Sequence, residues 1–246
     1  MIDDEYRNLV QQLNVKQKEF FYHVLNWMKT KTYPLYHFLS GGTGVGKSVL
    51  LKALNQALVK HFSHNAGENP GNVHVLICAS TGNAAFNVGG CTVHSAFHIP
   101  ADQGFHFKPL DMQQLSNLQS KFKCLKILFI DEISMVGKNM FNSINLRLQE
   151  ILDCTKPFGG VSVISFGDLY QLKPVFDQWI FASNNSSTES IASLGTNLWT
   201  DYFLLYELDQ IMRQKDDLRF DYAIPFFTPS KKSTHSSIKG WQALKK

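Results

Sequence analysis

Residues 41–48 form a glycine-rich segment that fits the phosphate-loop pattern G-x-x-x-x-G-K-[ST]. Four glycines allow the backbone to curl so that successive N–H groups face phosphate oxygens, and a following helix adds its positive N-terminal end. In this pattern the lysine reaches the β- and γ-phosphates, and the serine hydroxyl ligates Mg²⁺. We therefore expect ATP phosphates at Gly41, Gly42, Thr43, Gly44, Val45, Gly46, Lys47 and Ser48.

An acidic pair, Asp131 and Glu132, directly follows the apolar run at 125–130. Carboxylates at the end of a strand hold the Mg²⁺ shell and orient the attacking water in phosphoryl transfer. We expect Asp131 to serve the metal and Glu132 to orient or deprotonate the water. Acidic residues after strands also occur as helix caps, so this prediction depends on the phosphate loop being real.

Two further residues are candidates for contact with the transferred phosphate. Gln171 lies in the GDLYQLKP string at 167–174, after another apolar run, where it could sense the γ-phosphate. Arg213, in the IMRQ string at 211–214, could stabilise the developing charge. The alternatives are a surface turn for Gln171 and a helix-surface position for Arg213.

Apolar segments that alternate with helical patterns must position these residues. Alternating strands and helices predict an α/β fold, a P-loop NTPase domain with a central parallel sheet flanked by helices. Ligands bind such sheets at the carboxyl ends of the strands, where the candidate residues fall. The expected helices are 16–31, one starting near Lys47, and 139–152. The expected strands are 35–40, 73–79, 125–130, 161–166 and 203–208.

The pattern divides the chain into one domain, residues 1–222, and a basic loose tail, residues 223–246. Residues 99–120 look like a small insertion with a short helix at 112–119, and residues 183–190 like a polar loop. Residues 231–246 carry five lysines and no acids, so subtracting five from the formal net charge of +4 leaves −1 for residues 1–230. Composition alone therefore does not predict a basic nucleic-acid groove.

Bulk properties exclude several classes of protein. Hydrophobic residues make up 44% of the chain, which favours a folded core over disorder. No apolar run approaches a membrane span, and the acidic N-terminus has no signal-peptide core. The four cysteines follow no zinc or disulfide pattern, which indicates a reducing compartment; they are Cys78, Cys91, Cys124 and Cys154.

Taken in order, these strings resemble the PIF (petite integration frequency) family of superfamily-1 helicases over about residues 10–220. LNVKQ at 13–17 resembles the family's Q motif, whose glutamine, here Gln17, reads adenine. DEISM at 131–135 and GDLYQL at 167–172 are the most specific strings, and MRQ at 212–214 resembles a later motif. The segments at 79–86 and 90–95 resemble those that touch single-stranded DNA.

The resemblance implies a RecA-like motor that hydrolyses ATP with Mg²⁺ and moves 5′ to 3′ on single-stranded DNA. It places DNA contacts at Thr81, Gly82, Thr92 and His94, although a histidine beside a glycine turn is commonly structural. Phe86 and Phe97 are candidates for base stacking or, more commonly, for the core. Repair, recombination, telomere maintenance and the response to DNA damage are the implied processes, in the nucleus and also in mitochondria. The sequence is also similar in style to copies carried by Helitron-type transposons.

The family continues into a second RecA-like domain, and this sequence does not contain that pattern. A motor of this kind works by opening and closing a cleft between two such domains. The sequence therefore predicts either a helicase motor domain or a truncated remnant that binds nucleotide and single-stranded DNA without unwinding. A third class, other P-loop ATPases such as clamp loaders, is disfavoured by the Q-motif segment and the GDLYQL string.

Overall fold

The computed structural model describes residues 2–63, 71–100, 107–182 and 197–212. Within these ranges six strands form one parallel sheet in the order β3-β2-β4-β5-β1-β6. The strands are β1 Tyr36–Ser40, β2 Val75–Ala79, β3 Cys91–Thr92, β4 Ile127–Asp131, β5 Ser162–Gly167 and β6 Leu204–Glu207. Parallel pairing confirms the expected sheet and sends every carboxyl end to the same edge.

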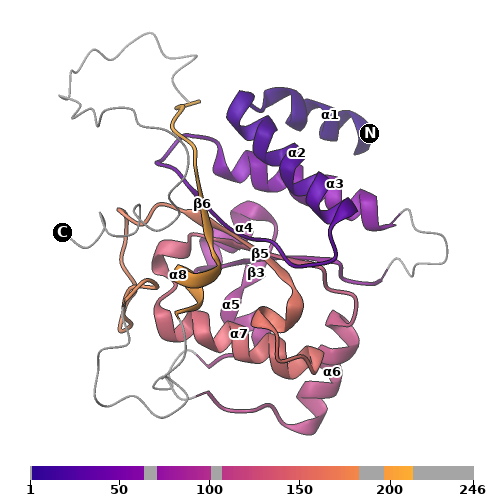
Figure 1. Ribbon diagram of the computed structural model, residues 1–246, viewed down its shortest axis with the longest axis vertical. Coiled ribbons are helices and arrows are strands. Elements are labelled where there is room, and N and C mark those ends of the chain that lie inside the picture. Colours follow the sequence, from indigo (N-terminus) through magenta and orange to yellow (C-terminus); the bar gives the residue numbers. More distant parts are fainter. Residues whose placement is uncertain (1, 64–70, 101–106, 183–196, 213–246) are drawn as a thin grey trace.

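Helices cover both faces of the sheet, with α1, α2 and α3 on one side and α5, α6 and α7 on the other (Figure 1). The helices are α1 Ile2–Gln12, α2 Val15–Thr30, α3 Lys47–Ser63, α4 Gly82–Val88, α5 Val93–Phe97, α6 Met112–Phe122, α7 Lys138–Leu152 and α8 Leu198–Tyr202. Two 3-10 turns are η1 Ile133–Met135 and η2 Pro157–Gly160. The α/β architecture expected from the sequence is therefore confirmed.

The core has two parts because side chains alternate across each strand. In β4, Ile127 and Phe129 join the cluster with α2 and α3, whereas Leu128 and Ile130 join the cluster with α5, α6 and α7. All four side chains are fully buried. A strand that buries both faces needs a continuous apolar run, which is why β4 was recognisable in the sequence.

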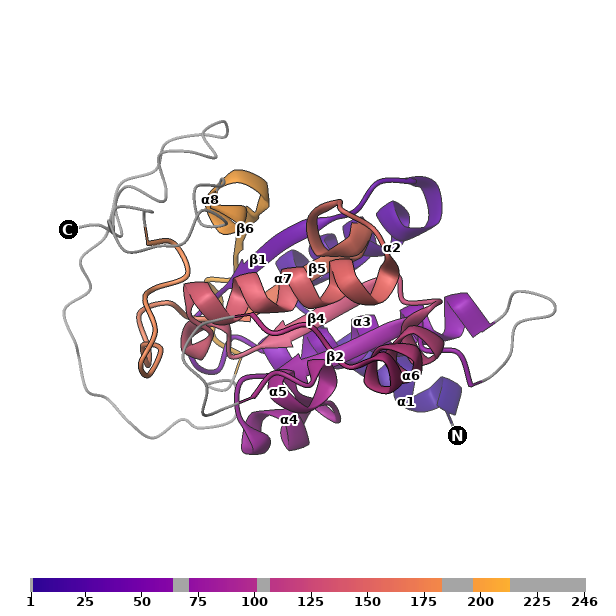
Figure 2. The same ribbon diagram turned by 90° about the horizontal axis from the view of Figure 1, so that it is seen from below.

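Part of the inserted segment at 99–120 contributes to the core. Its helix α6 packs against α7 (Figure 2). The helix extends to Phe122, beyond the expected end at residue 119, because Leu118 and Phe122 are buried in the core. The side chain of Asp111 caps the helix by accepting a hydrogen bond from Gln114 N at 2.8 Å. The polar loop expected at 183–190 and the tail expected at 223–246 lie outside the described residues.

Among the helices that the structure describes, none is both long and apolar enough to cross a membrane.

The buried His37 should make the stability of the fold depend on pH. The side chain of His37, on β1, packs edge-on against Phe20, and its Nδ1 is buried without a hydrogen-bond partner. Burial lowers the pKa of His37 from its ordinary 6.5 to about 4, and the nearby His23 acts in the same direction. Between these values the unfolded chain binds a proton that the folded protein does not, so the free energy of unfolding falls as the pH falls through this window.

We therefore expect His37→Gln to weaken the acid sensitivity of the fold. Glutamine cannot gain a proton, so the variant should lose about 1–3 kcal/mol less stability than the parent between about pH 6.5 and about pH 4.5. Urea unfolding followed by circular dichroism at both pH values measures this difference. Equal losses in the two proteins would contradict a neutral, buried His37.

Candidate nucleotide and DNA site

The glycine-rich loop lies between β1 and α3, as expected from the sequence. Gly44 and Gly46 adopt the left-handed region, with φ of 85° and 80°, which favours glycine. Gly41 is required for a different reason: a Cβ there would lie 2.9 Å from the Leu208 carbonyl oxygen. Gly42 has open space instead, with nothing within 4 Å of a Cβ. The loop is therefore shaped by packing on one side and open to a ligand on the other.

Gln17 is buried against the phosphate loop and is hydrogen-bonded to it. Its Nε2 donates a 2.7 Å hydrogen bond to the Val45 carbonyl, and its Oε1 accepts one of 2.8 Å from Asn14 N. Asn14 Oδ1 in turn accepts from Gln17 N, which completes a capping box at the start of α2. The Gln17 side chain is 1% exposed, and a Cβ on Gly46 would lie 2.5 Å from its Nε2. Gln17 thus anchors the phosphate loop, and its role in reading adenine stays a prediction.

Residues 208–212, at the end of the last described range, are hydrogen-bonded to β1 and to the phosphate loop. Leu208 N donates to Ser40 O at 2.8 Å, and Met212 N donates to Gly44 O at 2.9 Å. The Met212 sulfur also accepts a 3.4 Å hydrogen bond from Asn14 Nδ2. The MRQ string therefore begins at the phosphate loop, whereas Arg213 lies outside the described residues.

Lys47 is the first residue of α3, and its amino group is folded back onto the loop. Nζ donates to the carbonyl oxygens of Gly41 at 2.6 Å and Gly42 at 3.0 Å. Burial lowers the pKa of Lys47, while the negative charges of Glu132, Asp168 and Asp131 raise it, in that order. The lysine is thus held among three carboxylates at the edge of the sheet.

Asp131, the last residue of β4, is 5% exposed. Burial raises the pKa of its carboxyl from 3.8 to about 6, the backbone N–H of Glu132 opposes that shift, and the charge of Glu132 adds to it. A buried carboxylate whose charge is disfavoured gains stability from a nearby cation. With the Ser48 hydroxyl at the second position of α3, it offers hard oxygen ligands of the kind that Mg²⁺ takes. The residues therefore fit this ion.

Glu132 has a strained backbone, with a φ of 52° in the left-handed region. For a residue other than glycine this conformation is costly and persists only where the surroundings impose it. Here the chain turns directly from β4 into η1, where Ile133 and Ser134 are buried. The turn leaves the Glu132 side chain partly exposed beside the buried Asp131.

Gln171 contacts the phosphate loop directly. Its Nε2 lies 3.2 Å from Thr43 Oγ1 and 3.2 Å from Asp168 Oδ2. The Asp168 side chain also accepts from Tyr170 N at 3.0 Å, which fixes the turn after β5. Asp168 was not among the residues assigned a role from the sequence, although it too follows an apolar strand, one residue further on than Asp131 does. The structure thus brings Thr43, Lys47, Asp131, Glu132 and Gln171 to one edge.

The segments predicted to touch DNA follow the neighbouring strands β2 and β3. Thr81 caps α4 and Thr92 caps α5, with side-chain oxygens 3.3 Å from Ala84 N and 3.2 Å from Ser95 N. A Cβ on Gly82 would meet nothing within 4 Å, so the backbone there is open to a ligand. His94 is half-buried, and burial lowers its pKa. All four residues follow the carboxyl ends of β2 and β3, at the edge of the sheet that also carries the phosphate loop. Their contacts with DNA stay predictions.

The two phenylalanines in this region differ. Phe97 is fully buried among the residues of α5 and α6, so it belongs to the core and not to a stacking surface. Phe86, on α4, is 86% exposed. Phe86 is therefore the one of the two that remains available to a base.

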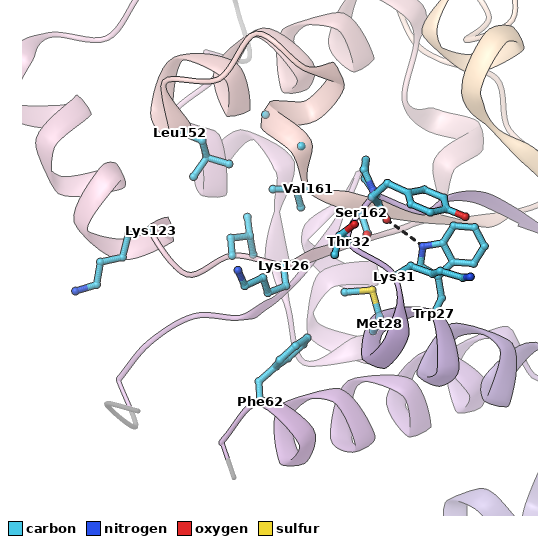
Figure 3. A pocket seen from close by; sticks show the side chains of 15 residues that line it. Trp27, Met28, Lys31, Thr32, Phe62, Lys123, Lys126, Leu152, Val161 and Ser162 are labelled. Atoms are coloured by element: carbon cyan, nitrogen blue, oxygen red, sulfur yellow. Dashed lines mark hydrogen bonds between the residues drawn. The ribbon is translucent and has the colours of Figure 1, made fainter. Parts of the chain in front are cut away.

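A separate pocket of about 540 Å³ lies at the opposite edge of the sheet, where the lining includes residues just before β1, β4 and β5 (Figure 3). Trp27 and Tyr33 both line it, and Trp27 Nε1 donates a 3.1 Å hydrogen bond to the Tyr33 carbonyl. Lys31, Lys123 and Lys126 belong to the lining, and none of the described lining residues is acidic. Lys31 and Lys123 are the C-cap residues of α2 and α6, where a positive charge complements the helix dipole. The pocket contains none of the predicted ATP residues.

Comparison with known proteins supports the family suggested by these motifs. The sequence model of the family described as PIF1-like helicase matches residues 12–222. The chain is 31% identical over 195 residues to the ATP-dependent DNA helicase PIF1 of Candida albicans, a match that covers 74% of this chain and 20% of that protein. It is 34% identical over 143 residues to the ATP-dependent DNA helicase RRM3 of Saccharomyces cerevisiae, covering 56% of this chain and 18% of the relative.

Solved structures agree with this likeness. The crystal structure of Pif1 helicase from Candida albicans matches with a TM-score of 0.57 and 28% identity, over 83% of this chain and 41% of that one. Pif1 helicase from Bacteroides in complex with ADP-AlF3 and ssDNA matches with a TM-score of 0.53 and 29% identity, over 80% of this chain and 43% of that one. This chain therefore spans less than half of each protein to which it is compared.

The anchoring contact of Gln17 generates a prediction for stability. Gln17→Ala leaves the Val45 carbonyl and the Asn14 N–H without their partners, so the free energy of unfolding should fall by about 1–3 kcal/mol. Chemical denaturation measures the change. Gln12→Ala, at the exposed end of α1, is the matched control and should stay within about 0.5 kcal/mol of the parent. A Gln17 variant as stable as this control would show that the anchor contributes little.

Proposed function

The chain belongs to the PIF1-like helicase family, and we propose that it is the ATP-hydrolysing motor domain of a DNA helicase. The observation that carries the proposal is the convergence of Lys47, Asp131, Glu132 and Gln171 on the phosphate loop. A phosphate loop alone is common to many ATPases. The Gln171–Thr43 contact and the relatives named ATP-dependent DNA helicase favour this class among them.

In the proposed site each residue has one task. Lys47 exchanges the carbonyls of Gly41 and Gly42 for the β- and γ-phosphate oxygens, so its charge moves from the loop to the ligand. Glu132 orients or deprotonates the attacking water, and Gln171, hydrogen-bonded to Thr43, senses the γ-phosphate. Gln17 reads adenine, as the family resemblance implies, and Arg213 stabilises the transferred charge.

The metal of this site is proposed to be Mg²⁺, held by Ser48 and Asp131. When bound it neutralises charge on the β- and γ-phosphates. The buried position of Asp131 supports the assignment, because burial disfavours the charged carboxylate and a bound cation would offset that cost. ATP and single-stranded DNA are the proposed ligands. Movement is proposed to run 5′ to 3′, in repair, recombination and telomere maintenance in the nucleus.

Coupling to DNA is proposed to use the neighbouring strand ends. Thr81, Gly82, Thr92 and His94 follow β2 and β3, and β2 pairs directly with β4, which ends at Asp131. A shift at the metal ligand can therefore reach the DNA segments through paired strands. The second candidate function is a protein that binds nucleotide and single-stranded DNA without appreciable turnover, which the same motifs would serve.

Two substitutions separate nucleotide binding from hydrolysis. Lys47→Ala removes the positive charge nearest the phosphates and should weaken ATP binding at least tenfold, whereas Glu132→Gln keeps the shape, binds ATP and should lower turnover at least a hundredfold. Fluorescent-nucleotide titration and single-turnover phosphate release, with and without single-stranded DNA, measure the two effects. Lys52→Ala, an exposed position on the same helix, is the control. Full affinity in the Lys47 variant would refute the site, and a parent that binds ATP without releasing phosphate would favour the second function.

Binding of single-stranded DNA should depend on salt and on His94. Affinity should fall steeply between about 50 mM and about 200 mM salt and should exceed affinity for duplex DNA. His94→Asn should weaken binding roughly threefold to tenfold. His98→Asn is the matched control, because that exposed residue ends the same short helix in a left-handed conformation that asparagine tolerates. Fluorescence anisotropy measures the salt dependence, the preference for single strands over duplex, and the affinities of the two histidine variants. Equal losses in both histidine variants would remove His94 from the contact surface.

A further inference from the structure

Two cysteines face each other across the strands that lead to the DNA segments. Cys78 on β2 and Cys91 on β3 are register partners in the parallel sheet, and their sulfur atoms lie 4.0 Å apart. Neighbouring strands are separated by about 4.8 Å, which falls within the Cα separation that a disulfide accepts. Rotation of the side chains and a small movement of β3 are all that a bond between them requires.

The backbone before Cys91 explains why the pair is so close. Gly89 ends α4 in the left-handed conformation, with φ of 69°. A Cβ on Gly90 would lie 2.5 Å from the carbonyl oxygen of Ile77, the residue before Cys78. Gly89 thus allows the chain to turn, and Gly90 allows it to approach β2 closely. Together they place Cys91 beside Cys78.

The two sulfur atoms have unequal surroundings. Cys78 is 0% exposed, whereas Cys91 is half-buried and therefore open to small reagents. A hydrogen bond from Cys78 lowers the pKa of the Cys91 thiol to about 7, with help from the charge of Lys121 on α6. The same interaction raises the pKa of Cys78. A reactive, accessible thiolate beside a protonated thiol is the arrangement in which the first sulfur is oxidised and the second resolves it.

We propose that Cys78 and Cys91 form a reversible disulfide, a modification site through which hydrogen peroxide or a similar two-electron oxidant acts on the DNA-binding edge. Its consequence for DNA rests on the function proposed above, whereas the bond itself does not. In a reducing compartment such a disulfide is transient and regulatory.

The chemistry balances in two steps. The Cys91 thiolate attacks one oxygen of peroxide, the O–O bond breaks, and the released hydroxide takes a proton to give water and a Cys91 sulfenic acid. The Cys78 sulfur then attacks the Cys91 sulfur, the S–O bond breaks, and a second water leaves with the Cys78 proton. The two sulfurs together lose two electrons to peroxide, and a dithiol reductant restores both thiols.

Closing the sulfur pair should move β3 more than β2. β2 is held by β4 over five register positions, whereas β3 pairs with β2 over only two. The sulfurs must approach from 4.0 Å to about 2.05 Å, so the shift falls on the start of β3. Thr92, which caps α5, follows Cys91 directly, and the disulfide should therefore displace Thr92 and His94 relative to Thr81.

The test oxidises the full chain with hydrogen peroxide, blocks the remaining thiols with an alkylating reagent and maps the peptides by mass spectrometry. We expect a peptide that joins Cys78 to Cys91, with Cys124 and Cys154 alkylated, and its disappearance after dithiothreitol. Single-stranded DNA affinity should fall roughly fivefold on oxidation and recover on reduction. Cys78→Ala, on β2 and outside both segments assigned to DNA, should bind DNA as the reduced parent does and should form no joined peptide after peroxide. Cys91→Ser should likewise form no joined peptide, and peroxide should leave its own DNA affinity unchanged.

Each outcome decides a separate point. Oxidation of Cys91 to its sulfinic acid without a joined peptide, or equal modification of all four thiols, would overturn the disulfide site. A joined peptide with unchanged DNA affinity would overturn its effect on the DNA-binding edge. Failure of the proposed function looks different, because the reduced parent would then bind no single-stranded DNA while the joined peptide still formed.

Discussion

Parallel pairing of the strands is the constraint on which the other features depend. Since β2, β4, β5 and β1 all run in the same direction, their carboxyl ends meet at one edge. The chain can then place a phosphate loop after one strand, an acidic pair after another and a glutamine turn after a third, and have all of them meet. The cost is that the central strands must be covered on both faces, which the helices accomplish with two separate clusters of buried side chains.

Burial of charge at that edge gives the site its character. Lys47 and Asp131 are both disfavoured in their charged forms by burial, and the charge of each partly offsets that effect on the other. Loop carbonyls occupy Lys47, and a backbone N–H serves Asp131. An anionic ligand with its cation would satisfy both at once. Two buried ionisable groups with shifted pKa values at one edge of the sheet are typical of a functional site.

The features visible in the sequence were those encoded within a few consecutive residues. The glycine loop and the acidic pair after β4 needed only local spacing, and the longer strands were recognisable because burial on both faces demands an unbroken apolar run. Features that join distant segments were not visible. No local sequence pattern around Gln17 predicts its hydrogen bond to Val45. The two-residue strand β3 is too short to show the alternation of side chains that identifies a strand. The exposure of Phe86 and the burial of Phe97 likewise depend on helices that only the folded chain brings together.

The hydrogen bond from Met212 N to Gly44 O has a mechanical consequence. Gly44 lies in the middle of the phosphate loop at 41–48, so a change in the loop backbone there would act directly on Met212. Leu208, directly after β6, is hydrogen-bonded to Ser40 at the end of β1, so residues 209–211 connect a bond to the sheet with a bond to the loop. A displacement of the loop would therefore change the path of this short segment relative to the sheet.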